Sequence, residues 1–291
     1  MPQMRFHIVH VVPDPALHGL HGYREVIETL QWGLTSLGHA ATVAENAFAE
    51  GSVNIVLGFQ MLSEAALEYA PPDTIVYNFE QLAGLAPETL KPAYRVAARR
   101  LRLWDYSEHN LAAWAGLGPA RPAVHVPVGW APILARIPRG ATQDIDVLFY
   151  GVPGQRRLGL YSQLCRTGAS CVFACGLYGA ARDSLIARAK LVLNVDLNDS
   201  RRIFEIVRVS YLLANAKAVV AAIRPHTLLE SDLRDAVAVA SAEQVPARCV
   251  ELLANEPLRK QLEERGEQAI RARDIRSILA RALEATGLDA R

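Results

Sequence analysis

Basic side chains gather behind a polar loop in the stretch LVLNVDLNDSRRIFEIVRVSYLLANAKAVVA, which covers residues 191–221. Residues 191–195 form an apolar run of strand length, and the spacing of apolar residues predicts a helix over about 200–215. In an open parallel sheet, ligands bind at the loop after a strand, and the N-terminus of the next helix attracts phosphate. Arg201 and Arg202 add two positive charges there. The stretch therefore predicts a phosphate- or nucleotide-binding unit.

Other polar residues of the same stretch could have either a structural or a functional role. Glu205 and Arg208 are three positions apart, a spacing that puts both on one helix face, where a surface ion pair is worth only about 0.3–0.5 kcal/mol. Asn198 lies between Asp196 and Asp199 in the segment DLND, which could bind a cation or simply shape the loop. We favour the loop role and predict no metal site.

A second glycine-containing loop follows the apolar run 145–150. Gly151 opens this loop, and Arg156 and Arg157 follow it at the start of an expected helix. Because these arginines come directly after a strand and a glycine loop, we expect at least one of them to bind phosphate. Tyr178, after the apolar run 170–174, could frame a nucleobase or belong to a plain turn.

Strands alternate with helices along both halves of the chain, which predicts parallel, doubly wound sheets. The regular pattern breaks near residues 129–143, where glycine and proline interrupt it. We therefore expect two domains, 1–138 and 139–291, with the last helix able to pack back on the first domain. A chain of 291 residues is long for one hydrophobic core, which also favours two domains.

Composition excludes several classes of protein. The 31 basic and 30 acidic residues leave a net charge of +1, so nucleic acid is not an expected partner. No apolar run reaches the roughly 20 residues of a membrane span, and the first residues lack the plan of a signal peptide. The cysteines show no CxxC spacing, which argues against a zinc site or a redox pair and favours reduced thiols in the cytoplasm: Cys165, Cys171, Cys175 and Cys249.

The order of these segments resembles the group 1 glycosyltransferases of the GT-B fold, in which two Rossmann-like domains face a cleft. Five segments carry the resemblance and together span nearly the whole chain: HGLHGYREVIETLQWGLTSLGH, HVPVGWAP, DVLFYGVPGQRR, LIARAKLVLNVDLNDSRRIFEIVRVSYLLANAKAVVA and VELLANEPLRKQLEERGEQAI. The resemblance implies an acceptor-side N-terminal domain and a C-terminal domain that binds a nucleotide sugar. It further implies hexosyl transfer from a nucleoside-diphosphate sugar, UDP or GDP most naturally, to a hydroxyl of a glycan, small molecule or protein.

For such a reaction, the leaving diphosphate needs positive charge, and the acceptor hydroxyl needs positioning and, in an inverting reaction, a base. The resemblance assigns donor binding to a set of polar residues and glycines in the second half, with no cofactor and no metal: Gly151, Arg156, Arg157, Tyr178, Asn198, Arg201, Arg202, Glu205 and Arg208. Glu205 is also a candidate catalytic residue.

Two residues of the first half are candidate bases for the acceptor. Glu80 follows the apolar run 74–78, where it could act on a hydroxyl or complement a helix dipole. His21 lies with His18 in the first glycine loop, and imidazole titrates near neutral pH. Two histidines three apart could also hold a metal, but no third ligand is evident.

One departure from the family pattern concerns the two glutamates, eight apart, that many retaining members carry. The position of the second glutamate falls near Tyr211, and Glu205 is six residues earlier. Retention and inversion therefore both stay open. Two alternatives remain, a sugar-nucleotide epimerase of the same fold and a non-catalytic nucleotide-sugar-binding protein.

Overall fold

The computed structural model describes residues 3–14, 22–138, 142–197 and 201–288. The chain forms two compact units: residues 1–131 together with 274–291, and residues 132–273. The last helix, α10 (Ile275–Ala285), therefore belongs to the first unit. The predicted asparagine and histidine sites at Asn198 and His21, and the neighbouring His18, lie outside the described residues.

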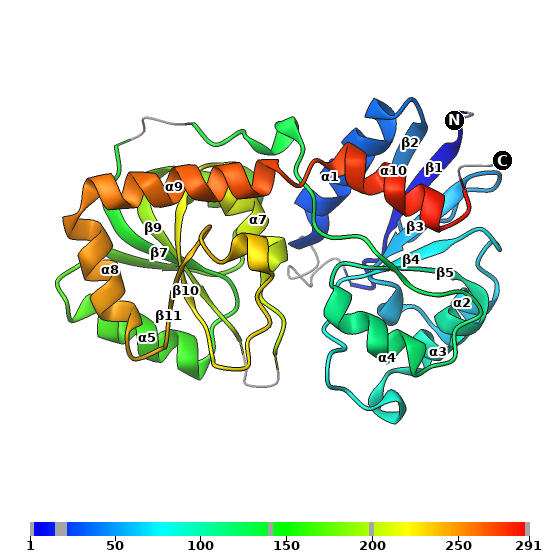
Figure 1. The fold of residues 1–291 in the computed structure, drawn as a ribbon, viewed down its shortest axis with the longest axis horizontal. Helices are drawn as coiled ribbons and strands as arrows, with labels where there is room; N and C mark the ends of the chain where they lie inside the picture. The colour runs from blue at the N-terminus through cyan, green and yellow to red at the C-terminus, as the bar shows by residue number, and fades with distance from the viewer. Residues whose placement is uncertain (1–2, 15–21, 139–141, 198–200, 289–291) are drawn as a thin grey trace. The chain divides into compact units, whose positions relative to one another are not determined.

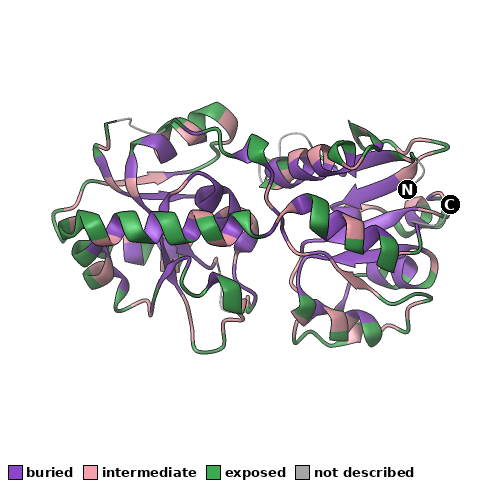
Figure 2. Cartoon of the chain, turned by 45° about the horizontal axis from the view of Figure 1, so that its top comes forward, coloured by how far each residue is buried: buried purple, intermediate pink, exposed green. Residues whose placement is uncertain are grey.

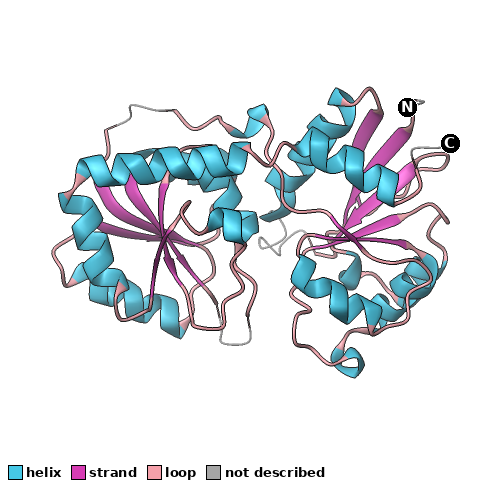
Figure 3. Ribbon diagram, in the orientation of Figure 1, coloured by secondary structure: helices cyan, strands magenta, loops and turns pink. Residues whose placement is uncertain are grey.

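The first unit is built on a parallel sheet with helices on its faces (Figures 1 and 3). Within the described residues its strands run in the order β2-β1-β3-β4-β5-β6: β1 (Arg5–His10), β2 (Ala40–Glu45), β3 (Val53–Leu57), β4 (Ile75–Asn78), β5 (Arg102–Asp105) and β6 (Val124–His125). Its helices are α1 (Arg24–Ser36), α2 (Glu64–Glu68), α3 (Pro92–Arg100), α4 (Leu111–Ala115) and α10. The central strands β4 and β5 are buried along their whole length, as expected where helices cover both faces of a sheet (Figure 2).

Close packing of α10 against α1 completes the first unit. A Cβ added at Gly33 of α1 would come within 2.6 Å of Cδ1 of Leu279, so the lack of a side chain at Gly33 lets α10 pack closely there. At the other end of α10, the indole Nε1 of Trp104 donates to Oγ1 of Thr286 at 2.8 Å. The tryptophan is fully buried, and Thr286 therefore satisfies a donor that has no access to water.

The second unit has a parallel sheet in the order β11-β10-β9-β7-β8 within the described part of the chain. The strands are β7 (Ile145–Tyr150), β8 (Cys171–Ala174), β9 (Ala189–Val195), β10 (Ala218–Ala222) and β11 (Ala238–Ala240). The helices are α5 (Gln155–Cys165), α6 (Gly179–Arg188), α7 (Ile206–Ala214), α8 (Val245–Ala254) and α9 (Glu256–Arg271). The prediction of parallel α/β sheets in both halves is confirmed.

Alternation along the strands divides the side chains of the second unit between its two faces. Phe149 and Val195 belong to the core cluster that α5, α8 and α9 complete, together with Leu160, Cys249 and Leu262. The residues next to them in sequence, Tyr150 and Asn194, point to the opposite face. The polar residues of the candidate site follow β7 and β9 at this end of the sheet.

The structure corrects the predicted start of α7. The helix begins at Ile206 rather than near 200, because the preceding residues form an extended segment that pairs with Leu228. Phe204 N donates to Leu228 O at 3.0 Å, and Leu228 N donates to Arg202 O at 2.7 Å. Ile203 and Phe204 are both buried in this extended segment. Their spacing from the apolar residues of α7 therefore looks like that of a continuous helix, although the two residues are not helical.

A short turn of 3-10 helix covers Pro87–Thr89, and α3 begins only at Pro92. Proline fixes φ and lacks an N–H, so it starts a helix more readily than it continues one.

Candidate functional site

Two guanidinium groups of the second unit meet at a glycine just past the end of β7. Gly151 has φ +135, and its N–H donates to the carbonyl of Ala174 at 2.9 Å. A Cβ added to Gly151 would lie 3.2 Å from Nη2 of Arg208 and 3.6 Å from Nη1 of Arg157. The absence of a side chain at this position therefore allows both arginines to approach the backbone of the loop.

Arg208 lies in the first turn of α7, with its guanidinium carbon 5.5 Å from the centre of the Tyr150 ring. Its Nη1 is buried, and none of the described groups accepts a hydrogen bond from it. A buried donor without an acceptor is costly. The N-terminus of a helix also carries partial positive charge. This corner of the unit is therefore suited to an anion that would accept from Arg208.

Arg157 forms its hydrogen bonds with the backbone around the loop itself. The side chain is buried, its Nε donates to the carbonyl of Val195 at 2.9 Å and its Nη1 donates to the carbonyl of Val152 at 2.8 Å. Burial, and then the nearby positive charge of Arg208, lower the pKa of Arg157 to about 10. The guanidinium remains charged at neutral pH and joins the ends of β7 and β9, with two of its donors already used by the chain.

Asp196, directly after β9, anchors the segment that leads to α7. Its Oδ2 accepts from Nη2 of Arg224 at 3.1 Å, and the same nitrogen donates to the carbonyl of Arg201 at 2.6 Å. Burial raises the pKa of the Asp196 carboxyl, and the positive charge of Arg224 opposes that shift. The segment 201–205 is therefore held by a nearly buried ion pair.

Glu205 does not share a helix face with Arg208 as predicted, because Glu205 is the residue that precedes α7. Its Oε2 instead lies 3.5 Å from Nη1 of Arg201, and both side chains are partly exposed. Arg202 is exposed in the extended segment, and Arg156 lies half-buried at the start of α5. Among the predicted donor-site residues, Arg157 and Arg208 both lie close to Gly151.

Two further polar groups lie on the same side of the sheet. Tyr178 precedes α6; burial raises its pKa, and the positive charges of Arg208 and Arg182 lower it, which places the phenol near Arg208. Asn194 of β9 is 2% exposed, and no described group donates to its Oδ1. A single amide inside an otherwise apolar strand is the feature of the sequence that marks Asn194.

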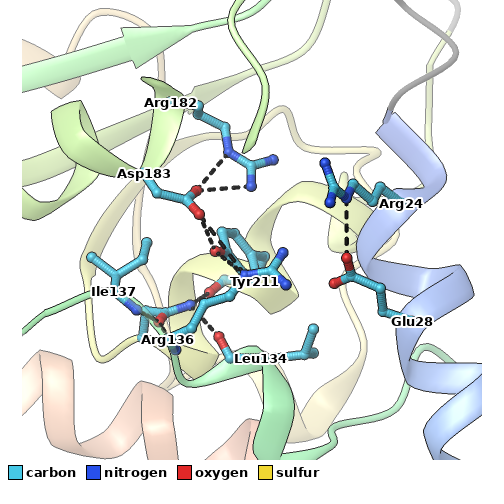
Figure 4. Close-up of polar contacts among 9 residues, drawn as sticks. Arg24, Glu28, Leu134, Arg136, Ile137, Arg182, Asp183 and Tyr211 are labelled. Carbon is cyan, nitrogen blue, oxygen red and sulfur yellow. Dashed lines mark hydrogen bonds and ion pairs between the residues drawn. The ribbon is translucent and has the colours of Figure 1, made fainter. Parts of the chain in front are cut away.

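Tyr211 lies near the place where the sequence resemblance predicts a second glutamate. Its hydroxyl donates to Oδ2 of Asp183 at 2.7 Å and accepts from Nε of Arg136 at 3.0 Å, as Figure 4 shows. The guanidinium carbon of Arg182 lies 4.5 Å from the centre of the ring. The tyrosine is 2% exposed, so it ties α7 to α6 and to the segment around Arg136 rather than presenting a carboxylate.

In the first unit, Glu80 follows β4 and is held at both its backbone and its side chain. Its Oε1 lies 3.5 Å from the hydroxyl of Tyr23 and 3.3 Å from Nε2 of Gln60. Its N–H donates to Oδ1 of Asn78 at 3.1 Å, and its carbonyl accepts from Nδ2 of Asn110 at 2.8 Å. The half-buried carboxylate therefore has a fixed position with one oxygen partnered.

Asp105, which the sequence analysis did not single out, organises this loop from beneath. Its fully buried carboxylate accepts from Nδ2 of Asn78 at 2.7 Å, from Nδ2 of Asn110 at 2.9 Å, from Nε1 of Trp114 at 2.8 Å and from the N–H of Ser107 at 2.9 Å. Burial raises the pKa of Asp105 to about 7, while these four hydrogen bonds favour the ionised form. The same two asparagines hold the backbone of Glu80.

Across the described ranges, no cluster of three or more histidine, cysteine, aspartate or glutamate side chains has the arrangement of a metal site. Nor does any helix in those ranges combine the length and apolar character needed to cross a membrane.

Comparison with known proteins finds relatives by structure only. No family model matches the chain, and no curated protein matches it by sequence. Among solved structures, it resembles AviGT4, a glycosyltransferase involved in avilamycin A biosynthesis, with a TM-score of 0.63 and 16% identity over 98% of this chain and 97% of the other.

Two more structures match over the same length. An α-glucosyltransferase in complex with UDP and a 13-mer DNA containing an HMU base gives a TM-score of 0.66 at 9% identity, over 98% of this chain and 100% of the other. HepE of Anabaena in complex with UDP gives 0.59 at 12% identity, over the same shares of the two chains. The predicted GT-B fold is therefore confirmed.

Proposed function

We propose that the chain is a glycosyltransferase that takes a sugar from a nucleoside-diphosphate sugar, with UDP as the first candidate nucleotide. The observation that carries the proposal is the buried, unpartnered Nη1 of Arg208 beside Gly151. A diphosphate oxygen would supply the missing acceptor and meet the N-terminus of α7. The neighbouring folds solved with UDP support this choice of nucleotide.

The charge that develops on the leaving diphosphate would be stabilised by Arg208, with Arg157 holding the loop in place. This arrangement of fixed positive groups supports metal-independent transfer. Glu80 is the candidate base for the acceptor hydroxyl, because its carboxylate is positioned by Tyr23 and Gln60. The acceptor is a hydroxyl compound of unspecified class.

The test has a binding step and a catalytic step. UDP, GDP, TDP, CMP and ADP are titrated against the chain by calorimetry, and the corresponding sugar nucleotides are then assayed for release of the free nucleotide with EDTA present. We expect one diphosphate to bind and its sugar nucleotide to be hydrolysed slowly without an acceptor. Failure of every nucleotide to bind would refute the proposal.

The second candidate is a non-catalytic nucleotide-sugar-binding protein, and the environment of Tyr211 favours it. A tyrosine hydrogen-bonded to Asp183 and Arg136 lies near the place where the resemblance predicts the second carboxylate. Binding of a sugar nucleotide without any release of diphosphate, tested with a panel of sugar and glycan acceptors, would favour this candidate over the enzyme.

A further inference from the structure

Two of the four cysteines lie together although their spacing in the sequence gives no sign of it. Cys165 is the last residue of α5 and Cys171 the first of β8. Burial, and then interactions with the Cys165 thiol, raise the pKa of Cys171, which places the two thiols close together. Burial, and then an interaction with the same thiol, raise the pKa of the Tyr161 hydroxyl. The same hydroxyl donates to the carbonyl of Cys171 at 3.1 Å.

The connection between α5 and β8 makes this contact a local property of the fold. Thr167 N donates to the carbonyl of Leu164 at 3.0 Å, and Gly168 N donates to the carbonyl of Cys165 at 3.3 Å. Gly168 has φ +84, a left-handed conformation that ends the helix and reverses the chain. The pair is thus held by a tight helix-to-strand turn rather than by a CxxC motif.

The two thiols differ in access. Cys165 is exposed, whereas Cys171 is half-buried. An oxidant from solution therefore meets Cys165 first, and Cys171 is the neighbour that can react next. Burial raises the pKa of Cys171 to about 12, so this sulfur is a thiol at neutral pH.

We propose that Cys165 and Cys171 are a modification site at which a hydroperoxide produces a reversible disulfide. In the first step, the Cys165 thiolate attacks one oxygen of hydrogen peroxide and becomes a sulfenic acid, and the other oxygen leaves as water after protonation. In the second step, the sulfur of Cys171 attacks the sulfenic sulfur. The S–O bond breaks, and the hydroxyl leaves as a second water with the Cys171 proton. Two thiols are oxidised and one peroxide is reduced.

Mass spectrometry of the full-length chain tests the proposal. The protein is treated with hydrogen peroxide at neutral pH, remaining thiols are alkylated, and the chain is digested with trypsin. Cleavage at arginine places Cys165 in peptide 158–166, and Cys171 and Cys175 together in peptide 167–182. We expect the two peptides to be joined with the loss of two hydrogens, fragmentation to place the bond at Cys171, and dithiothreitol to separate them.

Two variants decide which sulfur is the partner. Cys175→Ser, which removes an exposed thiol at the other end of β8, should leave the cross-link intact, whereas Cys171→Ser should abolish it. A cross-link that survives in Cys171→Ser would overturn the proposal, because Cys175 would then be the partner. Oxidation of Cys165 to sulfinic acid in the wild type, without any cross-link, would overturn it as well.

Discussion

Nη2 of Arg208 lies so close to Gly151 that a Cβ at position 151 would come within 3.2 Å of it. The glycine, the first turn of α7 and the end of β7 thus come together at a guanidinium whose Nη1 is buried. The proposed binding of the donor by the second unit depends on this close approach.

Replacing Gly151 with alanine tests the contact from the side of the glycine. The φ of +135 is strained for any L side chain, which costs about 1–3 kcal/mol, and the new methyl group would push Arg208 away. We expect Gly151→Ala to lower the thermal midpoint of the second unit and to weaken nucleotide binding at least tenfold, measured by scanning and titration calorimetry.

The matched control for this variant is Gly159→Ala. Gly159 lies within α5, and nothing lies within 4 Å of the place its Cβ would take. Alanine is a better helix former than glycine by roughly 1 kcal/mol, so this variant should be neutral or slightly stabilising. Equal effects of the two substitutions would show that Gly151 has no special role.

Asp105 gives the first unit a pH dependence whose sign follows from its raised pKa. The folded state binds this proton more tightly than the unfolded state, so the contribution to stability is present below about pH 4 and is lost as the pH rises through about 7. Relative to Asp105→Asn, the wild type should lose on the order of 4 kcal/mol of unfolding free energy over this range.

Tryptophan fluorescence measures this difference selectively. All four tryptophans lie in the first unit: Trp32, Trp104, Trp114 and Trp130. Urea unfolding of the wild type and of Asp105→Asn is therefore followed by fluorescence at a series of pH values. If the unfolding free energy of the wild type rose with pH relative to that of Asp105→Asn, the expectation would be contradicted, and the four hydrogen bonds to the carboxylate would outweigh its burial.

The docking of α10 is tested at Thr286. Thr286→Val keeps the shape of the side chain but leaves the buried indole N–H of Trp104 without its acceptor, at a cost of about 1–3 kcal/mol. Thr286→Ser keeps the hydroxyl and is the matched control. We expect the urea midpoint of unfolding, followed by fluorescence, to fall in Thr286→Val and to fall much less in Thr286→Ser. Equal falls in the two variants would show that packing alone holds the helix.

The sequence predicted the sheets well because apolar strands and glycine-ended loops leave a local pattern. It failed where tertiary contacts imitate such a pattern: Ile203 and Phe204 are buried by an extended pairing with Leu228, not by a helix. The different roles of Arg157 and Arg208 could not be predicted from the sequence either. Both are basic residues near a loop, and only the structure shows that one donates to chain carbonyls while the other has a buried nitrogen without an acceptor.

The structural role of Asp105 could not be predicted from the sequence for a related reason. A single aspartate at the end of a strand resembles any loop carboxylate, and its four donors come from segments as far apart in sequence as Asn78 and Trp114. The proximity of Cys165 and Cys171 could not be predicted either, because a helix-to-strand turn that brings two cysteines together has no characteristic sequence motif.

The most direct test of the central claim is titration calorimetry of UDP against the wild type, Arg208→Met and Arg188→Met. Arg188 forms an exposed ion pair with Asp144 at 2.6 Å and serves as the surface control. A charge-assisted hydrogen bond is worth about 1.5–3 kcal/mol, so Arg208→Met should weaken binding by about 10- to 100-fold while Arg188→Met binds like the wild type. Wild-type affinity in Arg208→Met would contradict the assignment of the donor site.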